Sequence, residues 1–227
     1  MKERGMIFNG EMVRALLDGR KTQTRRIVKG TDSAVKFCKE WNINGEEVFV
    51  VLGEKDHTGM NPVLGAISCP FGAVGNRIWV REAFRVHSRA TDVATLVYKA
   101  SERNSWTEQT HRVPVAVCNK PATPEKWTPS LHMPRWASRI LLEITDVRVE
   151  RLNAISEEDA EAEGINMEAL ADSQDRYDCI ADHNMTGRPT ATGAFKYLWE
   201  SIYGEESWKA NSWVWVISFK RVEGGAA

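Results

Sequence analysis

The sequence predicts an α+β fold in which a small mixed β-barrel is flanked by helices. Segments with a strand-like pattern outnumber segments with a helical pattern. The two kinds do not alternate along the chain, as they would in a doubly wound fold. The order along the 227 residues is a helix, several strands, a short helix, a longer helix and a closing strand. We expect one domain over residues 1–223 and a disordered tail, GGAA, at residues 224–227.

The first element is a helix that begins after Asn9 and runs to about Asp18. Asparagine is a favoured N-terminal cap, and Gly19 can end the helix in a left-handed conformation. Apolar residues recur between these two points at helical spacing. They are Val13, Leu16 and Leu17.

The helix leads into an unusually cationic segment, GRKTQTRR, at residues 19–26. This segment carries four cationic side chains, whereas the whole chain has a formal net charge of -1. One interpretation is a solvated basic surface, helped by the helix dipole, which favours cations such as Arg20 and Lys21 near a C-terminus. The other is a pocket for an electron-rich ligand.

The middle of the chain predicts further strands. Residues 30–75 are rich in Gly, Asn, Asp and Lys and hold one apolar run, Val48–Leu52, which indicates an excursion with one or two strands. Residues 75–84, GNRIWVREAF, predict a turn that feeds a strand. Residues 86–135 add two strand-like pieces, TLVYKA and VPVAVC, and a loop rich in proline.

The C-terminal part holds the longest strand pattern, Arg139–Leu152, which we expect to pair with a closing strand at Trp213–Val222. As barrel strands, these two would leave residues 19–26 packed across a barrel opening. Between them, ISEEDAEAEGI at residues 155–165 predicts a short helix with a capping-box-like start. FKYLWESIYG, at residues 195–204, predicts a second helix with one apolar face.

Composition narrows the class of protein. The near-neutral charge argues against binding a long polyanion through the overall field, so a nucleic-acid contact needs a local patch. The four cysteines form no CxxC pair, and a chain of this length can build its own core without disulfides. We therefore expect no metal, no cofactor and a reduced, cytoplasmic protein. The first residues lack a signal-peptide pattern, and no apolar run approaches the roughly 20 residues of a membrane helix.

Four motifs occur in a fixed order along the chain. GRKTxTxR is followed by GNRIWV at residues 75–80, then by LNAISEEDAEAEG at 152–164, and finally by VWVISF at 214–219. This order resembles the ASCH domain family, especially its longer members from phages and prophages. The resemblance implies a PUA-like barrel linked to RNA. It covers residues 6–28, 75–84, 139–165 and 194–222, and it leaves residues 30–74, 86–137 and 166–192 as insertions.

The resemblance also implies site residues. The compact bacterial members remove the acetyl group from N(4)-acetylcytidine with a lysine, a threonine and a glutamate. The motif positions place these three on Lys21, Thr24 and Glu163. We further expect a set of substrate-binding residues: Arg20, Thr22, Arg25, Arg26 and Trp79. From sequence alone each has a plainer interpretation, such as a wet acidic helix face for Glu163 and core packing for Trp79.

The chemistry of amide hydrolysis is compatible with these residue types. A threonine hydroxyl is a weak nucleophile until a base takes its proton, and a lysine can be that base if burial and neighbouring cations lower its pKa. Glu163 could orient Lys21 or protonate the leaving amine, although an ion pair would also hold the lysine protonated. In an extended segment Lys21 and Thr24 point to opposite sides, so they meet only if the segment bends. None of the three is expected to be a core packing residue.

Three functions stay open at this point. The first is a metal-independent amidohydrolase acting on an acylated cytidine or a similar modified base. The second is a non-catalytic RNA-binding module that reads a base in the same pocket. The third is a metal-independent ribonuclease in which Lys21 and the arginines stabilise a phosphorane. The expected partner is a modified nucleoside or RNA, without a membrane, and the oligomeric state is left open.

Overall fold

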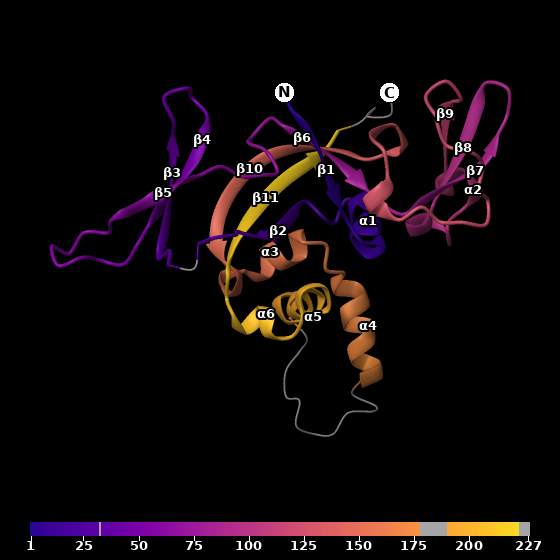
Figure 1. Cartoon of the computed structure of the whole chain (residues 1–227). Coiled ribbons are helices and arrows are strands. Elements are labelled where there is room, and N and C mark those ends of the chain that lie inside the picture. The colour runs from indigo at the N-terminus through magenta and orange to yellow at the C-terminus, as the bar shows by residue number, and fades with distance from the viewer. Residues whose placement is uncertain (32, 178–189, 223–227) are drawn as a thin grey trace. The chain divides into compact units, whose positions relative to one another are not determined.

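The computed structural model describes residues 1–31, 33–177 and 190–222 (Figure 1). The predicted disordered tail at residues 224–227 lies outside these ranges. The chain divides into two compact units. Unit 1 comprises residues 1–19, 74–145 and 219–227, and unit 2 comprises residues 20–73 and 146–218. The single domain over residues 1–223 stays a prediction.

Unit 1 begins with strand β1 (Glu3–Ile7) and helix α1 (Gly10–Leu17). The side chain of Asn9 accepts a hydrogen bond from the Met12 amide at 2.8 Å, and Gly19 has a positive φ of 77°. Both ends of the predicted helix are therefore confirmed. Its other elements are β6 (Arg77–Arg81), β7 (Phe84–Arg89), β8 (Val93–Tyr98), η1 (Lys99–Ser101), α2 (Trp106–Gln109), β9 (Thr110–Pro114), η2 (Ser130–His132) and η3 (Arg135–Ala137).

Strands β7, β8 and β9 of unit 1 form an antiparallel sheet in that order. This sheet covers a core in which Phe84, Leu96 and Tyr98 are fully buried. The Tyr98 hydroxyl donates a hydrogen bond to the carbonyl of Ala137 at 2.7 Å, so the one polar atom of this ring is satisfied inside the core. The stretch predicted as an insertion at residues 86–137 thus builds most of an organised sheet.

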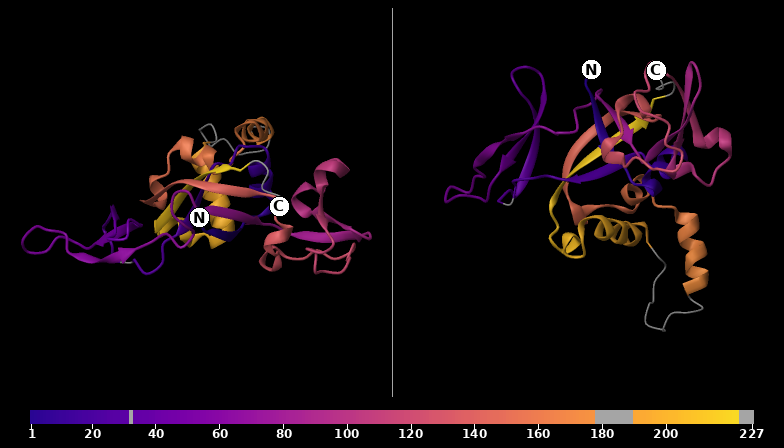
Figure 2. Two further views of the ribbon diagram at one scale, coloured as in Figure 1. Left: turned by 90° about the horizontal axis from the view of Figure 1, so that it is seen from above. Right: turned by 45° about the vertical axis from the view of Figure 1, so that its right-hand side comes forward.

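Unit 2 holds residues 20–26 of the cationic segment and four of the six described α-helices. Its elements are β2 (Gln23–Ile27), β3 (Lys36–Trp41), β4 (Glu47–Leu52), β5 (Val63–Ile67), η4 (Leu152–Ala154), α3 (Glu157–Ala162), α4 (Met167–Tyr177), α5 (Ala191–Tyr203) and α6 (Glu206–Lys209). Strands β3, β4 and β5 form an antiparallel sheet of three strands, where the sequence predicted one or two (Figure 2). Helix α5 contacts both α3 and α6.

Strands β10 (Leu141–Arg151) and β11 (Trp213–Arg221) have residues in both units. They are neighbours in a mixed sheet with the order β1-β6-β10-β11-β2, which confirms the predicted pairing of the longest strand with the closing strand. Within unit 2, the amide of Leu152 donates to the carbonyl of Ser212 at 3.0 Å, where this pairing ends.

The described strands form three open sheets, so the fold is α+β, as predicted, but none of these sheets closes into a barrel. A barrel requires every strand to have two hydrogen-bonded neighbours. In the mixed sheet, β1 and β2 are edge strands with one neighbour each. Residues 19–26 were expected to lie across a barrel opening, and this prediction is wrong because none of the described sheets closes into a barrel and residues 23–26 belong to the edge strand β2.

Candidate functional site

The candidate site lies in unit 2, where β2 carries the second half of the cationic segment. β2 pairs antiparallel with β11, and Thr24 lies opposite Ile217 in the register. Side chains alternate between the two faces of a strand, so Gln23 and Arg25 share one face and Thr24 and Arg26 share the other. The hydrogen bonds of these residues follow this division, because Gln23 and Arg25 both bind Asp159, whereas Arg26 binds Thr24.

The partner of the cationic segment is the C-terminal end of α3. Ser156 caps the start of this helix by accepting from the Asp159 amide at 3.1 Å, and Gly164, with a φ of 100°, follows its end. The last carbonyls of a helix have no partner within the helix. Here they are bound by the segment before β2. The Thr22 amide donates to Ala162 O at 2.8 Å, Lys21 Nζ to Glu163 O at 2.7 Å, and Arg20 NH1 to Gly164 O at 2.8 Å.

Lys21 and Glu163 form a buried ion pair at the centre of the charge network. Lys21 Nζ lies 2.7 Å from Glu163 Oε2, and both residues are only 2% exposed. Burial lowers the pKa of the Lys21 ammonium, the carboxylate of Glu163 opposes this, and the charges of Arg26 and Arg25 lower the pKa further. The net pKa of Lys21 lies below its ordinary value of 10.5. Proton release from this lysine is therefore easier than from a lysine in water.

Arg25 links the ion pair to further carboxylates. Its NH2 lies 2.8 Å from Asp159 Oδ2, and its NH1 lies 3.4 Å from Glu163 Oε1 and donates to Gln23 Oε1 at 2.6 Å. Its guanidinium also lies 5.9 Å from the ring centroid of Phe195 on α5. Arg25, a predicted substrate-binding residue, is only 1% exposed. In this structure its terminal nitrogens form hydrogen bonds with side chains of the protein itself.

Thr24 lies on the opposite face of β2 and is 0% exposed. Its hydroxyl accepts a hydrogen bond from Arg26 NH1 at 2.9 Å, and the same nitrogen donates to the Arg25 carbonyl at 2.8 Å. The structure thus groups the predicted residues into two sets, Lys21 with Glu163 and Thr24 with Arg26. Burial of Lys21, Thr24 and Glu163 also shows that the expectation of three non-core residues is wrong.

Two other predicted substrate-binding residues have different surroundings. Thr22 is exposed, and its backbone, rather than its hydroxyl, ties the segment to α3. Trp79 belongs to unit 1, in β6, where the guanidinium of Arg81 lies 5.4 Å from its ring centroid. A Cβ added at Gly5 of the paired strand β1 would lie 2.5 Å from this ring. Trp79 therefore packs closely over β1, and its contact with a substrate stays a prediction.

Sequence reasoning missed three residues of the charge network, namely Asp159, Arg148 and Glu150. Arg148 NH2 lies 2.7 Å from Asp159 Oδ2 and its Nε lies 2.6 Å from Glu150 Oε1. Glu150 Oε2 in turn lies 3.5 Å from Arg25 NH2. A signal was present, because Arg148 and Glu150 alternate along β10 at a spacing that places them on one face. Asp159 stands three residues after Ser156, at the acidic position of a capping box, and this local role hides its part in the charge network.

Asp159 makes the stability of unit 2 sensitive to acid. Burial raises the pKa of its carboxyl, but hydrogen bonds from Gln23, Arg25 and Arg148 outweigh this and hold the pKa below its ordinary value of 3.8. A carboxyl with a lowered folded-state pKa stabilises the protein above its unfolded-state pKa and loses this contribution as the pH falls through the folded-state pKa.

We therefore expect Asp159→Asn to lower the free energy of unfolding at pH 7 by about 1–2 kcal/mol, a value reduced for partial exposure of the side chain. The difference from wild type should shrink as the pH falls from about 4 towards 2. Urea unfolding at several pH values measures it, with the exposed neighbour Glu158→Gln as the control. A difference that stays constant down to pH 2 would contradict the assigned role of the charge.

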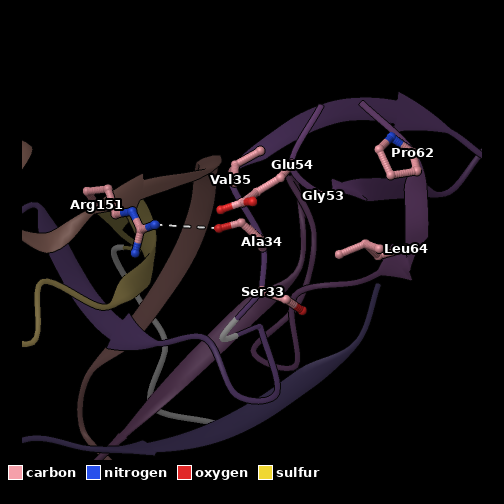
Figure 3. A pocket seen from close by; sticks show the side chains of 8 residues that line it. All are labelled: Ser33, Ala34, Val35, Gly53, Glu54, Pro62, Leu64 and Arg151. Atoms are coloured by element: carbon pink, nitrogen blue, oxygen red, sulfur yellow. Dashed lines mark hydrogen bonds between the residues drawn. The ribbon is translucent and has the colours of Figure 1, made fainter. Parts of the chain in front are cut away.

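Unit 2 also contains a pocket of about 400 Å³ between the β3–β5 sheet and the end of β10. Figure 3 shows Arg151 on one side and Ala34, Val35 and Leu64 on the other. The Arg151 guanidinium donates to the Ala34 carbonyl at 3.4 Å and lies 4.2 Å from the ring centroid of Trp213. None of the residues lining this pocket belongs to the Lys21–Glu163 pair or to the Thr24–Arg26 pair.

Within residues 1–31, 33–177 and 190–222, no group of three or more His, Cys, Asp or Glu side chains is arranged to hold a metal ion. In the same ranges, no helix is long and apolar enough to cross a membrane.

Comparisons with known proteins identify no relative of this chain. No family model matches the chain, and it has no significant match among curated proteins or among solved structures. The relation to the ASCH family therefore stays a prediction that rests on the order of four motifs along the sequence.

Proposed function

We propose that this protein is a metal-independent amidohydrolase of the ASCH type that acts in the cytoplasm on an acylated cytidine or a similar modified base. The observation that carries the proposal is the buried Lys21, whose Nζ lies 2.7 Å from Glu163 Oε2 and whose pKa is lowered mainly by burial. A lowered pKa increases the share of neutral lysine at a given pH, and the neutral amine is the form that can accept a proton as a general base. We also propose that the mixed sheet is an opened form of a PUA-like barrel, because the motifs fall on β2, β6, α3 and β11.

In the proposed reaction, the segment at residues 21–24 bends when substrate binds, so that Lys21 and Thr24, which have separate partners in this structure, meet. Thr24 Oγ1 then attacks the carbonyl carbon of the acyl group and its proton passes to neutral Lys21. The C–N bond then breaks, the amine nitrogen of the base takes the proton from Lys21, and the acyl group remains on Thr24 as an ester. Water attacks this ester with Lys21 again taking a proton. Thr24 regains its proton as the carboxylic acid leaves. Glu163 holds Lys21 in place and shares its proton.

Arg26 has two parts in this scheme. It already donates to the Thr24 hydroxyl, and after displacement from this hydroxyl its guanidinium can donate to the acyl carbonyl oxygen, where negative charge develops during attack. Because Thr24 is fully buried, substrate entry must displace Arg26 from this hydroxyl. Arg26 itself is half-buried at the edge strand, which is where such a displacement can occur.

One observation favours the second candidate, a module that binds a base without cleaving it. Lys21 and Arg20 both donate to main-chain carbonyls at the end of α3. These bonds satisfy carbonyls at a helix end, a structural role that a protein without catalytic activity would also require. In that case the cationic segment is first a helix cap, and its binding role depends on Arg26.

Turnover of N(4)-acetylcytidine tests the proposal. Wild type should release acetate with and without a chelator. Thr24→Val, which keeps the shape of the side chain but lacks the hydroxyl, should release none, and Thr24→Ser should retain part of the activity. A mass increase of one acetyl group on the wild-type protein would identify the ester.

No acetate release by folded wild type would reject the hydrolase, and calorimetric binding of the same nucleoside would then support the binding module. Cleavage of a short oligoribonucleotide without acetate release would instead indicate the ribonuclease.

A further inference from the structure

Unit 1 contains a second pocket, of about 350 Å³, between strand β7 and the loop at residues 120–132. Its volume falls in the range of small-molecule sites, near the lower end. The residues that matter for its chemistry are two lysines, a histidine, a tryptophan and two threonines. They are Lys120, Lys126, His132, Trp127, Thr123 and Thr128.

The pocket wall is held in place by backbone hydrogen bonds. The Thr128 amide donates to the Phe84 carbonyl at 2.7 Å, and the Phe84 amide donates back to the Thr128 carbonyl at 3.2 Å. The Thr123 amide donates to the Val86 carbonyl at 2.8 Å. The loop is therefore attached to the edge of β7 at two points, Phe84 and Val86. A wall that is already ordered reduces the entropy cost of binding a ligand.

Trp127 supplies a flat apolar wall. The guanidinium of Arg85 lies 4.5 Å from the centroid of its ring, a distance at which a cation is attracted to an aromatic face. This contact helps to fix the orientation of the ring, which also lines the pocket. An aromatic side chain in a fixed orientation is suited to stack on a planar base, an interaction of about 1–3 kcal/mol.

The charge of the pocket is of one sign. Its lining contains three basic side chains and no carboxylate. Two arginines of unit 1 also bind the loop from outside the pocket, Arg89 through the Lys120 carbonyl at 2.7 Å and Arg81 through the carbonyls of Ser130 and Leu131. In a chain of net charge -1, such a local excess of positive charge favours an anionic ligand.

We propose that this pocket binds a nucleotide, with the base against Trp127 and the phosphate between Lys120, Lys126 and His132. Both the free nucleotide and a nucleotide within a single RNA strand have this chemistry. The pocket lies in unit 1 and the Lys21–Glu163 pair lies in unit 2, so the inference does not depend on the proposed hydrolase activity. It assigns a role to His132 and to a loop that the motif resemblance leaves as an insertion.

Equilibrium binding of four probes tests the proposal: AMP, adenosine, inorganic phosphate and a fluorescent single-stranded octaribonucleotide. We expect AMP or the octamer to bind clearly more tightly than adenosine or phosphate alone. Trp127→Ala should weaken that binding about tenfold or more, and Trp127→Phe, which keeps an aromatic face, should weaken it less. The double variant Lys120→Gln/Lys126→Gln should flatten the salt dependence by roughly 0.7 of a log-log unit for each phosphate that the two lysines neutralise in wild type.

The matched control is Lys99→Gln, an exposed lysine of the same unit outside the pocket, which should bind like wild type. Thermal unfolding of each variant shows whether it is folded. Tight binding of AMP identifies the free nucleotide as the ligand, and tight binding of the octamer alone identifies the strand. The proposal is overturned if neither binds, or if folded Trp127→Ala and the double lysine variant bind as well as Lys99→Gln does. Acetylcytidine turnover should be unchanged in all of these variants, so the two proposals fail independently.

Discussion

Glu163→Ala is expected to lower the free energy of unfolding by about 3–5 kcal/mol. The carboxylate of Glu163 is within 2.7 Å of Lys21 Nζ and 3.4 Å of Arg25 NH1, and all three residues are almost fully buried. Removing this carboxylate leaves Lys21 without a negatively charged partner, because of these two cations Asp159 contacts only Arg25. The loss is large because a buried charge without its partner keeps its desolvation cost. Urea unfolding at pH 7 measures it.

The matched control is Glu161→Ala, two residues earlier in the same acidic segment. Glu161 is exposed, so its replacement should change the free energy of unfolding by no more than about 0.5 kcal/mol. A second test is the double variant Lys21→Met/Glu163→Leu, which removes both charges and should be more stable than Glu163→Ala. If Glu161→Ala and Glu163→Ala had equal effects, Glu163 would be a surface residue.

The contrast between these two glutamates also shows where sequence reasoning ends. In SEEDAEAE, every acidic residue fits a wet helix face, and the burial of Glu163 has no local signal. Only the order of motifs singled it out, and that order correctly brought Lys21 and Glu163 together. Its burial is set by contacts with residues about 140 positions away, which no window of the sequence contains.

The strands show a similar division. The pairing of β10 with β11 could be predicted, since both have long apolar patterns that require a covered face. Closure into a barrel could not, because it depends on whether two distant edge strands meet. Strand β5 was missed for a different reason. The sequence VLGAI has no polar side chain, so it lacks the apolar/polar alternation that identifies a half-buried strand, and four of its five residues are exposed in the structure.

The site was predicted only in part. A shared motif placed Lys21 and Thr24 three residues apart. The structure adds that Thr24 faces away from Arg25 and towards Arg26, because residues 23–27 are extended as an edge strand. In an extended segment the lysine and the threonine meet only if the chain bends. The proposed mechanism requires this contact, so the effect of replacing Lys21 on the reaction rate is its most direct test.

Lys21→Met is expected to reduce kcat/KM for N(4)-acetylcytidine by about 10³-fold, within the range of 10²–10⁴ that general bases contribute. Methionine keeps most of the length and apolar surface of lysine, but it cannot accept a proton. Thr24→Val should lose at least as much. The double variant should be no slower than the slower single variant, because residues that act as one unit give non-additive losses. Steady-state acetate release at 25 °C measures all three, with the exposed Lys29→Met as the control.

The pH dependence distinguishes a lost base from a damaged fold. In wild type the active form carries neutral Lys21, so the rate should rise with pH and level off above the pKa of this lysine. Burial and the charges of Arg26 and Arg25 place that pKa below 10.5 even though Glu163 opposes them. Glu163→Gln removes the opposing charge, so its rate should level off at a lower pH than that of wild type. In Lys21→Met the rising limb should vanish. A folded Lys21→Met variant that keeps both the wild-type rate and the wild-type limb would exclude Lys21 as the base, leaving its bonds to Glu163 with a purely structural role.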